Sequence, residues 1–546
     1  MTATAYASPS VVNKPSGSYD AIVIGAGVAG LYQVHRLRDL GLNVIGLETG
    51  SGVGGTWYWN RYPGCRFDSE SYIYQYWFSQ DVYESWTWSE RFPAQPEIER
   101  WMNFVADRCD LRKEFNFNTT VKSAVYDETK SRWVVTTDRG STFDAKYLVT
   151  CCGMLSAPLS EIFPGQSSFK GKLVHTSRWP KESIDLNGKR VGVIGIGATG
   201  IQVIQTIASQ CKHLKIFVRT PQYIIPMKNP KYGPAEAAWY KGRFDELKET
   251  VPNTFTGFEY DFVGAWEDHS PEQRREVMER IWNEGSLRLW LASYGEIFSD
   301  EKASDEISDF VREKMQERLK DPRLCDLLIP KDYGFGTHRV PLESGYLEVY
   351  HRANVEAISV RDNPIQCMTP EGIQLANGDV HELDVIIMAT GFDAGSGALT
   401  RIDIRGRGGR SLKEDWGRDI RTALGMQVHG YPNMFTTGAP LAPSAALCNM
   451  TTCLQQQVDW ITNCIDHVEQ SGMNVIEVTK EKEDEWVAHH DEIANGTLVV
   501  KTNSWYMGSN VDGKPRRLLS YIGGVGPYKK KCDEVTESGY AGFAKR

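Results

Sequence analysis

The sequence lacks the features that would mark a membrane protein or a nucleic-acid-binding protein. It has no run of about eighteen apolar residues, so no membrane-spanning helix is predicted. Its 61 lysines and arginines are outnumbered by 70 aspartates and glutamates, which gives a formal net charge of −9. Such an acidic chain is not expected to bind nucleic acid or an anionic membrane surface. Residues 1–17 lack the basic start and apolar core of a signal peptide, so we predict a flexible leader there.

The cysteines form no recognisable framework. There are eleven of them, an odd number, and none occurs as C-x-x-C. This pattern favours reduced thiols in a cytosolic (cytoplasmic) protein over a disulfide framework, a zinc site or a disulfide reductase. Cys151 and Cys152 are neighbours on a predicted strand and point to opposite faces, which favours core thiols over a redox pair. No metal site is predicted.

The chain contains the same strand–turn–helix pattern twice. At 546 residues it is too long for a single core, so several domains are expected. Each copy has an apolar strand (21–24 and 190–194), a glycine fingerprint, a helical stretch and a second strand (43–47 and 214–218). The fingerprint glycines are Gly25, Gly27 and Gly30 in the first copy and Gly195, Gly197 and Gly200 in the second. Both copies are βαβ units of the dinucleotide-binding kind, so the predicted fold class is α/β with two Rossmann-like domains.

The two copies differ in the residue that follows their second strand. Glu48 in the first copy is placed to accept hydrogen bonds from ribose hydroxyls. The second copy has Arg219, which would attract a 2′-phosphate that a carboxylate would repel. We therefore predict FAD at the first site and NADPH at the second. The alternatives are that the glycines serve only tight packing, that Glu48 and Arg219 are ordinary surface charges, and that Lys215 shares the role of Arg219.

Patterns farther along the chain set the domain limits. Each half shows a hairpin with a glycine turn, at 139–140 and 377–378, and then an apolar strand that closes on glycine. Before the second hairpin, apolar residues recur at helical spacing within a charged segment of about a hundred residues. The predicted parts are an FAD-binding domain (18–155 and 385–546), an NADP-binding domain (156–225 and 332–384) and a helical insertion (226–331).

Two segments resemble the signatures of one enzyme family. Phe169–Pro180 matches F-x-G-x-x-x-H-x-x-x-W-P, and Gly54–Asp68 matches G-G-x-W-x-x-x-x-Y-P-G-x-x-x-D. Together they resemble the Baeyer–Villiger monooxygenases, whereas the related N-oxygenating flavin monooxygenases depart at the W-P end. The resemblance runs from about Tyr19 to the C-terminus, and Phe335–Glu343 looks most similar to the acetone and methyl-ketone members.

This resemblance implies a defined reaction. NADPH would reduce bound FAD, O₂ would add at flavin C4a, and the deprotonated peroxide would attack a ketone. The resulting tetrahedral, Criegee-type adduct would rearrange to an ester or a lactone. Because the flavin supplies this chemistry, the protein must supply fixed charge and exclude water. The implied cofactors and partners are FAD, NADPH, O₂ and a small-molecule ketone.

The resemblance also implies roles for individual residues. Arg339 matches the family's catalytic arginine, a permanent cation that would stabilise the anionic peroxide and oxyanion. Asp68 matches the carboxylate that orients it, and His175 matches a hinge or bracing residue rather than a general base. Trp505 would fold over the nicotinamide from a mobile loop at 501–516. The other implied cofactor contacts are Gly55, Thr56, Trp57, Tyr74 and Val121 for FAD, and Thr199, Gln202, Thr220 and His338 for NADPH.

Other interpretations of these residues stay open. Arg339 could be a phosphate clamp, Asp68 a turn former, Trp57 and Tyr74 aromatic core, and Trp505 an exposed aromatic. His338 stands where many relatives have a lysine on the 2′-phosphate, which implies a narrower preference for NADPH over NADH. The alternative functions are S- or N-oxygenation and a non-catalytic FAD- and NADPH-binding role. Small linear ketones are the expected substrates, although the pocket depends on loops such as 441–447, and no oligomeric state is predicted.

Overall fold

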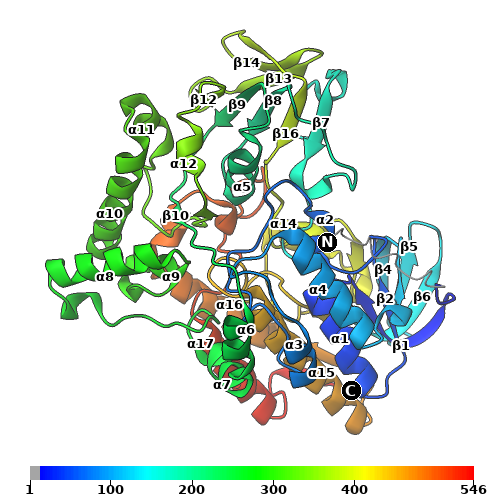
Figure 1. Cartoon of the computed structure of the whole chain (residues 1–546). Helices are drawn as coiled ribbons and strands as arrows, with labels where there is room; N and C mark the ends of the chain where they lie inside the picture. The colour runs from blue at the N-terminus through cyan, green and yellow to red at the C-terminus, as the bar shows by residue number, and fades with distance from the viewer. Residues whose placement is uncertain (1–12) are drawn as a thin grey trace.

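Two sheets with parallel strands form the framework of the computed structural model, which describes residues 13–546. Figure 1 shows the first sheet beside helices α1 and α4 (Val28–Asp39 and Gln95–Arg108), with the second sheet at the top of the view. The green helices of the chain's middle third stand to one side, and the C-terminal helices lie below. The predicted α/β class with two Rossmann-like units is therefore confirmed.

The first sheet is built around β1, which pairs in parallel with β2 on one side and β6 on the other. Both faces of β1 are covered, and residues 21–24 are accordingly a continuous apolar run. Strands β4, β5 and β6 continue as an antiparallel meander, which confirms the predicted turn at 139–140. Within residues 13–546 the order is β17-β4-β5-β6-β1-β2-β3, with β18 also on β6. The strands are β1 Gly17–Ile24, β2 Val44–Leu47, β3 Phe115–Asn116, β4 Val121–Asp127, β5 Arg132–Thr137, β6 Thr142–Thr150, β17 Asp403–Arg405 and β18 Met434–Thr436.

The second sheet is entirely parallel, in the order β12-β9-β8-β16-β7. A small antiparallel sheet adjoins it, and its β14–β15 hairpin confirms the predicted turn at 377–378. The parallel strands are β7 Lys172–His175, β8 Arg190–Ile194, β9 His213–Val218, β12 Val355–Ser359 and β16 Val385–Met388. The antiparallel ones are β13 Ile365–Thr369, β14 Gly372–Leu375 and β15 Val380–Glu382.

Strand β16 corrects one predicted domain limit. The boundary at 384/385 assigned residues 385–388 to the FAD-binding domain, but β16 lies between β7 and β8 of the second sheet. All four of its residues are buried. The sequence of such an apolar strand does not show which of the two sheets it belongs to. The chain therefore leaves the second sheet after Met388, not before Val385.

The predicted helical insertion is confirmed as a set of helices between two short strands. Strands β10 (Ile225–Pro226) and β11 (Leu342–Glu343) pair in parallel as a separate two-stranded sheet, so the insertion begins and ends at neighbouring points. Helix α8 begins with a capping box in which Ser270 and Gln273 satisfy each other's backbone N–H groups. The helices are α6 Pro234–Lys241, α7 Phe244–Thr250, α8 Pro271–Glu284, α9 Arg288–Leu291, α10 Glu301–Leu319 and α11 Pro322–Leu328.

The C-terminal part is more helical than the sequence indicated. Helix α15 packs against α1, where Gln33 Nε2 donates to Thr462 Oγ1 at 3.0 Å. Two further helices, α16 and α17, follow it, and neither was predicted from the sequence. Their charged, weakly periodic sequences concealed them. The remaining elements are α2 Thr56–Trp59, α3 Gln80–Ser85, α5 Ala198–Ile207, α12 Tyr346–Val349, α13 Gly397–Thr400, α14 Leu412–Arg418, α15 Met450–Gln470, β19 Ile476–Val478, α16 Lys480–Asn495, α17 Val525–Glu537 and β20 Phe543–Lys545.

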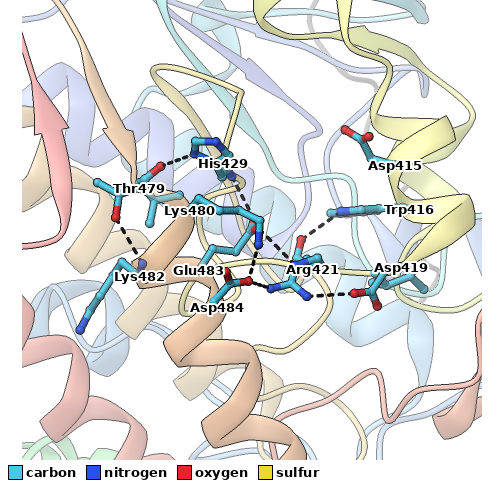
Figure 2. A network of polar contacts seen from close by, with 12 residues as sticks. Asp415, Trp416, Asp419, Arg421, His429, Thr479, Lys480, Lys482, Glu483 and Asp484 are labelled. Carbon is cyan, nitrogen blue, oxygen red and sulfur yellow. Dashed lines mark hydrogen bonds and ion pairs between the residues drawn. The ribbon is translucent and has the colours of Figure 1, made fainter.

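A polar network fastens the start of α16 to the segment after α14 (Figure 2). Arg421 pairs with Asp419 at 2.9 Å, with the buried Glu483 at 3.3 Å, and with Asp484. The other oxygen of Glu483 accepts the backbone N–H of His429 at 3.0 Å. Arg517, which follows the predicted mobile loop, joins the same network through Asp419. The end of the loop at 501–516 is therefore tied to this network through Arg517.

Three expectations from the sequence concern the N-terminal leader, the cysteines and membrane-spanning helices. Residues 1–12 of the predicted leader lie outside the described residues, while Lys14 is bound to Asn116 and Gly17 already begins β1. The sulfur atoms of Cys448, just before α15, and Cys453, in its first turn, lie in contact, a proximity that the sequence did not indicate; the nine other cysteines, all within residues 13–546, are free. None of the helices within residues 13–546 has both the length and the apolar character needed to cross a bilayer.

Candidate functional site

The first glycine fingerprint lies in the turn between β1 and α1, where other backbone segments pack closely against its glycines. A methyl group on Gly30 would lie 1.8 Å from the carbonyl oxygen of Gly25, so the helix can start only with glycine there. A methyl group on Gly55 would lie 2.8 Å from Cα of Gly27, and Gly54 N donates to Ala26 O at 2.9 Å. The signature segment 54–68 therefore rests directly on the fingerprint, which leaves the backbone N–H groups at the start of α1 free to face a pyrophosphate.

Glu48 lies at the end of β2 with both carboxylate oxygens engaged. Oε2 accepts Ala26 N at 2.7 Å and Oε1 accepts Gly50 N at 2.6 Å. Burial raises the pKa of Glu48 above its ordinary value, and these two N–H groups oppose that shift. The side chain is only 6% exposed, so it is not an ordinary surface charge. Each oxygen keeps a further lone pair with which a ribose hydroxyl could be bound.

The aromatic residues predicted near the flavin are bonded to each other. Trp57 Nε1 donates to Tyr74 OH at 3.0 Å, and both side chains are buried. Val121, also buried, begins β4 but packs in a different core cluster, while Thr56 is exposed at the start of α2. The geometry places Trp57 and Tyr74 within an aromatic cluster, and their contact with a flavin stays a prediction.

The second fingerprint repeats this design between β8 and α5. A methyl group on Gly200 would lie 2.2 Å from Gly195 O, whereas one on Gly197 would meet no atom of residues 13–546 within 4 Å. Gly197 therefore has open space beside the N-terminus of α5, where Thr199 occupies the first turn. An open glycine at a helix N-terminus is the feature that lets a pyrophosphate approach the backbone.

Gln202 of α5 makes contacts that the sequence did not indicate. Its Oε1 accepts the hydroxyl of Tyr62 at 2.9 Å, and its Nε2 donates to Arg66 O at 3.0 Å. Tyr62 and Arg66 belong to the signature segment 54–68, so Gln202 joins the two dinucleotide units. Its predicted contact with NADPH stays a prediction.

The residues predicted to recognise the 2′-phosphate lie at the carboxyl end of β9. Arg219 is exposed there, and its guanidinium forms no ion pair with any residue of 13–546. Lys215 lies farther back on β9 and pairs with Glu356 at 3.8 Å and with His381 at 3.1 Å. Lys215 is therefore already paired with other residues. The positive charge at the end of β9 is that of Arg219, and Thr220 follows it.

His338 approaches the same turn from the segment before β11. Its ring stacks on Tyr333 with 4.0 Å between centroids, and Tyr333 OH donates to Pro221 O at 2.6 Å, two residues beyond Arg219. Burial lowers the pKa of His338 to about 4, so the ring is neutral at pH 7. Its buried Nε2 has no partner among residues 13–546, which suits a group that binds a ligand.

Arg339 and Asp68, predicted as catalytic residues far apart in sequence, are brought into contact. Arg339 Nη2 donates to Asp68 Oδ2 at 3.0 Å, and Nη1 donates to the carbonyl of Ala445 at 2.9 Å. The guanidinium also lies over the buried ring of Trp290, 5.2 Å from its centroid. Burial opposes the charge of Arg339, but Asp68 more than offsets this, so the pKa of Arg339 lies above its ordinary value. The site therefore holds a permanent, oriented cation.

The loop at 501–516 contacts the turn of the chain that holds Ala445. Trp505 is partly buried and meets the ring of Tyr506 edge-on at 4.3 Å, and Tyr506 OH donates to Ala446 O at 3.0 Å. Lys514 fastens the far end of the loop to Asp393 at 2.6 Å. Trp505 is thus not a free surface aromatic. Ala445, Tyr506 and Trp290 were missed from the sequence, since a backbone carbonyl and two aromatic residues carry no motif.

His175 lies at the end of β7 in a bracing arrangement. Its Nδ1 accepts Ser177 N at 3.2 Å, and its ring meets Phe392 edge-on at 6.1 Å. Burial lowers the pKa of His175 to about 4, so the ring is neutral at pH 7. The contact with Phe392 joins the Phe169–Pro180 segment to the residues after β16, and the bracing role of His175 stays a prediction.

Comparisons with known proteins match nearly the whole chain. The family model described as flavin-binding monooxygenase-like matches residues 19–263. Acetone monooxygenase (methyl acetate-forming) of Gordonia sp. (strain TY-5) is 67% identical over 525 residues, which cover 96% of this chain and 98% of the relative. Cyclohexanone 1,2-monooxygenase of Acinetobacter sp. is 37% identical and covers 96% of each chain.

Solved structures agree with this similarity. A closed crystal structure of cyclohexanone monooxygenase has a TM-score of 0.94 at 40% identity and covers 97% of this chain and 99% of its own. A crystal structure of OTEMO in complex with FAD and NADP has a TM-score of 0.93 at 39% identity and covers 98% and 100% of the two chains. The same fold therefore holds both dinucleotides in that relative.

Two alanine substitutions should separate a structural glycine from a nucleotide-binding one. Gly200→Ala places a methyl group 2.2 Å from Gly195 O, so the apparent melting temperature should fall by several degrees. Gly197→Ala meets no described atom within 4 Å, so stability should be kept while KM for NADPH rises by about tenfold or more. Thermal unfolding without nucleotide and steady-state kinetics test both. Equal destabilisation by the two changes would contradict this assignment.

Proposed function

Because this chain belongs to the Baeyer–Villiger monooxygenases, the FAD- and NADP-dependent enzymes that convert ketones to esters or lactones, we propose that its substrates are small methyl ketones and that Arg339 and Asp68 form its oxygen-insertion centre. The observation that supports this centre is the Arg339 guanidinium held between the Asp68 carboxylate and the Ala445 carbonyl. Bound FAD, reduced by NADPH, supplies the activation of O₂ and the transfer of one oxygen atom.

The contribution of Arg339 is a positive charge that cannot be lost. A ketone oxygen gains negative charge as its carbonyl carbon is attacked, and a preorganised cation at that point lowers the barrier. The raised pKa of Arg339, caused by Asp68 against the effect of burial, keeps the guanidinium charged throughout the working pH range. Two of its donors are used by Asp68 and Ala445, which leaves others to reach the reacting oxygens.

The surroundings of Arg339 suit a reaction from which water is excluded. Trp290 beneath the guanidinium and Tyr506 beside it are 0% and 2% exposed. Exclusion of water strengthens the interaction between a fixed charge and a developing one. Asp68 orients the guanidinium through one hydrogen bond to one end of the fork, and the Ala445 carbonyl accepts from the other end.

The proposal of small methyl ketones is supported by the relative from Gordonia. That protein is named for acetone and for the methyl acetate it forms, and it is 67% identical over nearly all of this chain. The cyclohexanone and cyclopentanone monooxygenases are 37% and 35% identical. Turnover of a ketone series by the purified holoenzyme with NADPH should therefore give acetate esters fastest from short linear methyl ketones, measured by gas chromatography. Faster turnover of cyclic ketones would overturn the substrate proposal while leaving the reaction type intact.

Arg339→Ala should separate cofactor binding from ester formation. The variant should bind FAD normally, because Arg339 lies outside the fingerprint, but lose at least about a hundredfold in ester formation since the oxyanion partner is gone. Flavin absorbance of the purified protein and ester yield per NADPH consumed are the measurements. Arg339→Lys serves as the matched control that keeps the charge but not the fork geometry. An ester yield equal to that of the wild type in Arg339→Ala would remove Arg339 from the centre.

For the nicotinamide cofactor we infer that Arg219 is the 2′-phosphate ligand and that His338 contributes hydrogen bonding without charge. Support comes from the Arg219 guanidinium at the end of β9, which pairs with no acid among residues 13–546, and from the lowered pKa of His338, about 4, caused by burial. A cation–phosphate contact of this kind contributes about 1.5–3 kcal/mol.

Arg219→Ala should accordingly raise KM for NADPH by about ten- to a hundredfold and leave KM for NADH within about twofold, since NADH has no 2′-phosphate. Lys215→Ala is the matched control, because Lys215 pairs with Glu356 and should leave both KM values nearly unchanged. Steady-state kinetics with each cofactor decides the point. Equal effects of Arg219→Ala on both cofactors would show that another residue reads the phosphate.

A further inference from the structure

We propose that Tyr506 is a positioning residue that fixes the Arg339 guanidinium through the peptide groups of Ala445 and Ala446. The inference rests on the proposed role of Arg339. It concerns a hydroxyl that does not contact Arg339 directly and that no sequence motif marks. Its basis is the arrangement of two successive carbonyl groups in one turn of the chain.

The two carbonyls are bound from two different sides. Ala445 O accepts Arg339 Nη1 at 2.9 Å, and Ala446 O accepts Tyr506 OH at 3.0 Å. Both carbonyls flank Cα of Ala446 and belong to planar peptide units, so only φ and ψ of Ala446 can turn one carbonyl relative to the other. The hydroxyl of Tyr506 therefore bears on the direction in which the Ala445 carbonyl points.

The flanks of this turn are braced by the chain that follows the loop. Ser444 Oγ and Ser520 Oγ lie 2.8 Å apart, and Tyr521 N donates to Ala442 O at 3.0 Å. Ser444 O in turn accepts Leu447 N at 3.3 Å, which closes the turn. With its flanks held, the orientation of the two central carbonyls is set by their own partners, Arg339 and Tyr506.

Tyr506 is suited to this role because its hydroxyl stays protonated and fixed. The side chain is 2% exposed, and burial raises its pKa well above the ordinary value, so the hydroxyl remains a donor. Leu519 N donates to Tyr506 O at 2.8 Å and anchors the backbone. On its other side the ring meets Trp505 at 4.3 Å. Tyr506 thus connects the loop at 501–516 to the catalytic cation, and the cation is aligned when this loop is seated.

The test compares two variants that each remove one buried hydroxyl. Tyr506→Phe deletes the donor to Ala446 O. Tyr528→Phe deletes the hydroxyl of a fully buried tyrosine that donates to Leu424 O at 2.6 Å and is not part of the Arg339 site. In the FAD-loaded enzyme with NADPH and a methyl ketone, ester formed per NADPH consumed should fall about five- to tenfold in Tyr506→Phe. Tyr528→Phe should stay within about twofold of the wild type. Flavin content and apparent melting temperature show whether each variant is folded.

A double-mutant cycle distinguishes positioning from a general structural effect. In an Arg339→Lys background, where the fork contact with Ala445 O is altered, Tyr506→Phe should cause little further loss of ester. Independent, multiplicative losses would overturn the inference, and so would a Tyr506→Phe variant with the ester yield of the wild type. If Arg339→Lys and Arg339→Ala themselves formed ester normally, the proposed role of Arg339 would fail instead.

Discussion

The site depends on one partly buried cation, Arg339, being held in one orientation by parts of the chain that are distant in sequence. Arg339 precedes strand β11, Asp68 belongs to the segment that rests on the first fingerprint, and Ala445 precedes helix α15. A guanidinium that is largely withdrawn from water is stabilised by a counter-charge, and Asp68 provides it at 3.0 Å. Because the three anchors come from different elements, both sheets and the C-terminal helices must be in place before the charge is correctly directed.

The segment 54–68 links all three parts of the site. Gly55 touches Gly27 of the first fingerprint, Tyr62 binds Gln202 of the helix that follows the second fingerprint, and Asp68 binds Arg339. One stretch of fifteen residues therefore sets the distance between the two dinucleotide units and the cation. Each of the three residues has a physical reason for its position. Gly55 permits the close approach of two backbones, Tyr62 supplies a hydroxyl that reaches Gln202, and Asp68 supplies the negative charge beside Arg339.

What the sequence could predict was local pattern. The two βαβ units, both hairpins and the helical insertion follow from apolar periodicity and turn residues, and the Arg339–Asp68 contact followed from the family resemblance. Strand β16 was assigned to the wrong sheet, because the sequence of a strand buried on both faces does not indicate which strands it pairs with. Helices α16 and α17 were missed because charge masked their apolar faces. Ala445, Gln202 and Tyr506 were missed or given other roles because their contacts arise from tertiary placement, for which periodicity carries no signal.

The interleaving of the two sheets has a consequence for how the chain is made. Strand β16 enters the middle of the second sheet only at residues 385–388, and β18 pairs with β6 only at 434–436. During synthesis from the N-terminus, neither sheet has its full set of strands until most of the polypeptide has left the ribosome. The nascent protein must therefore carry an open sheet edge for much of its translation, and contacts of such long sequence separation form slowly. We expect chaperone dependence and truncation sensitivity to follow from this order of assembly.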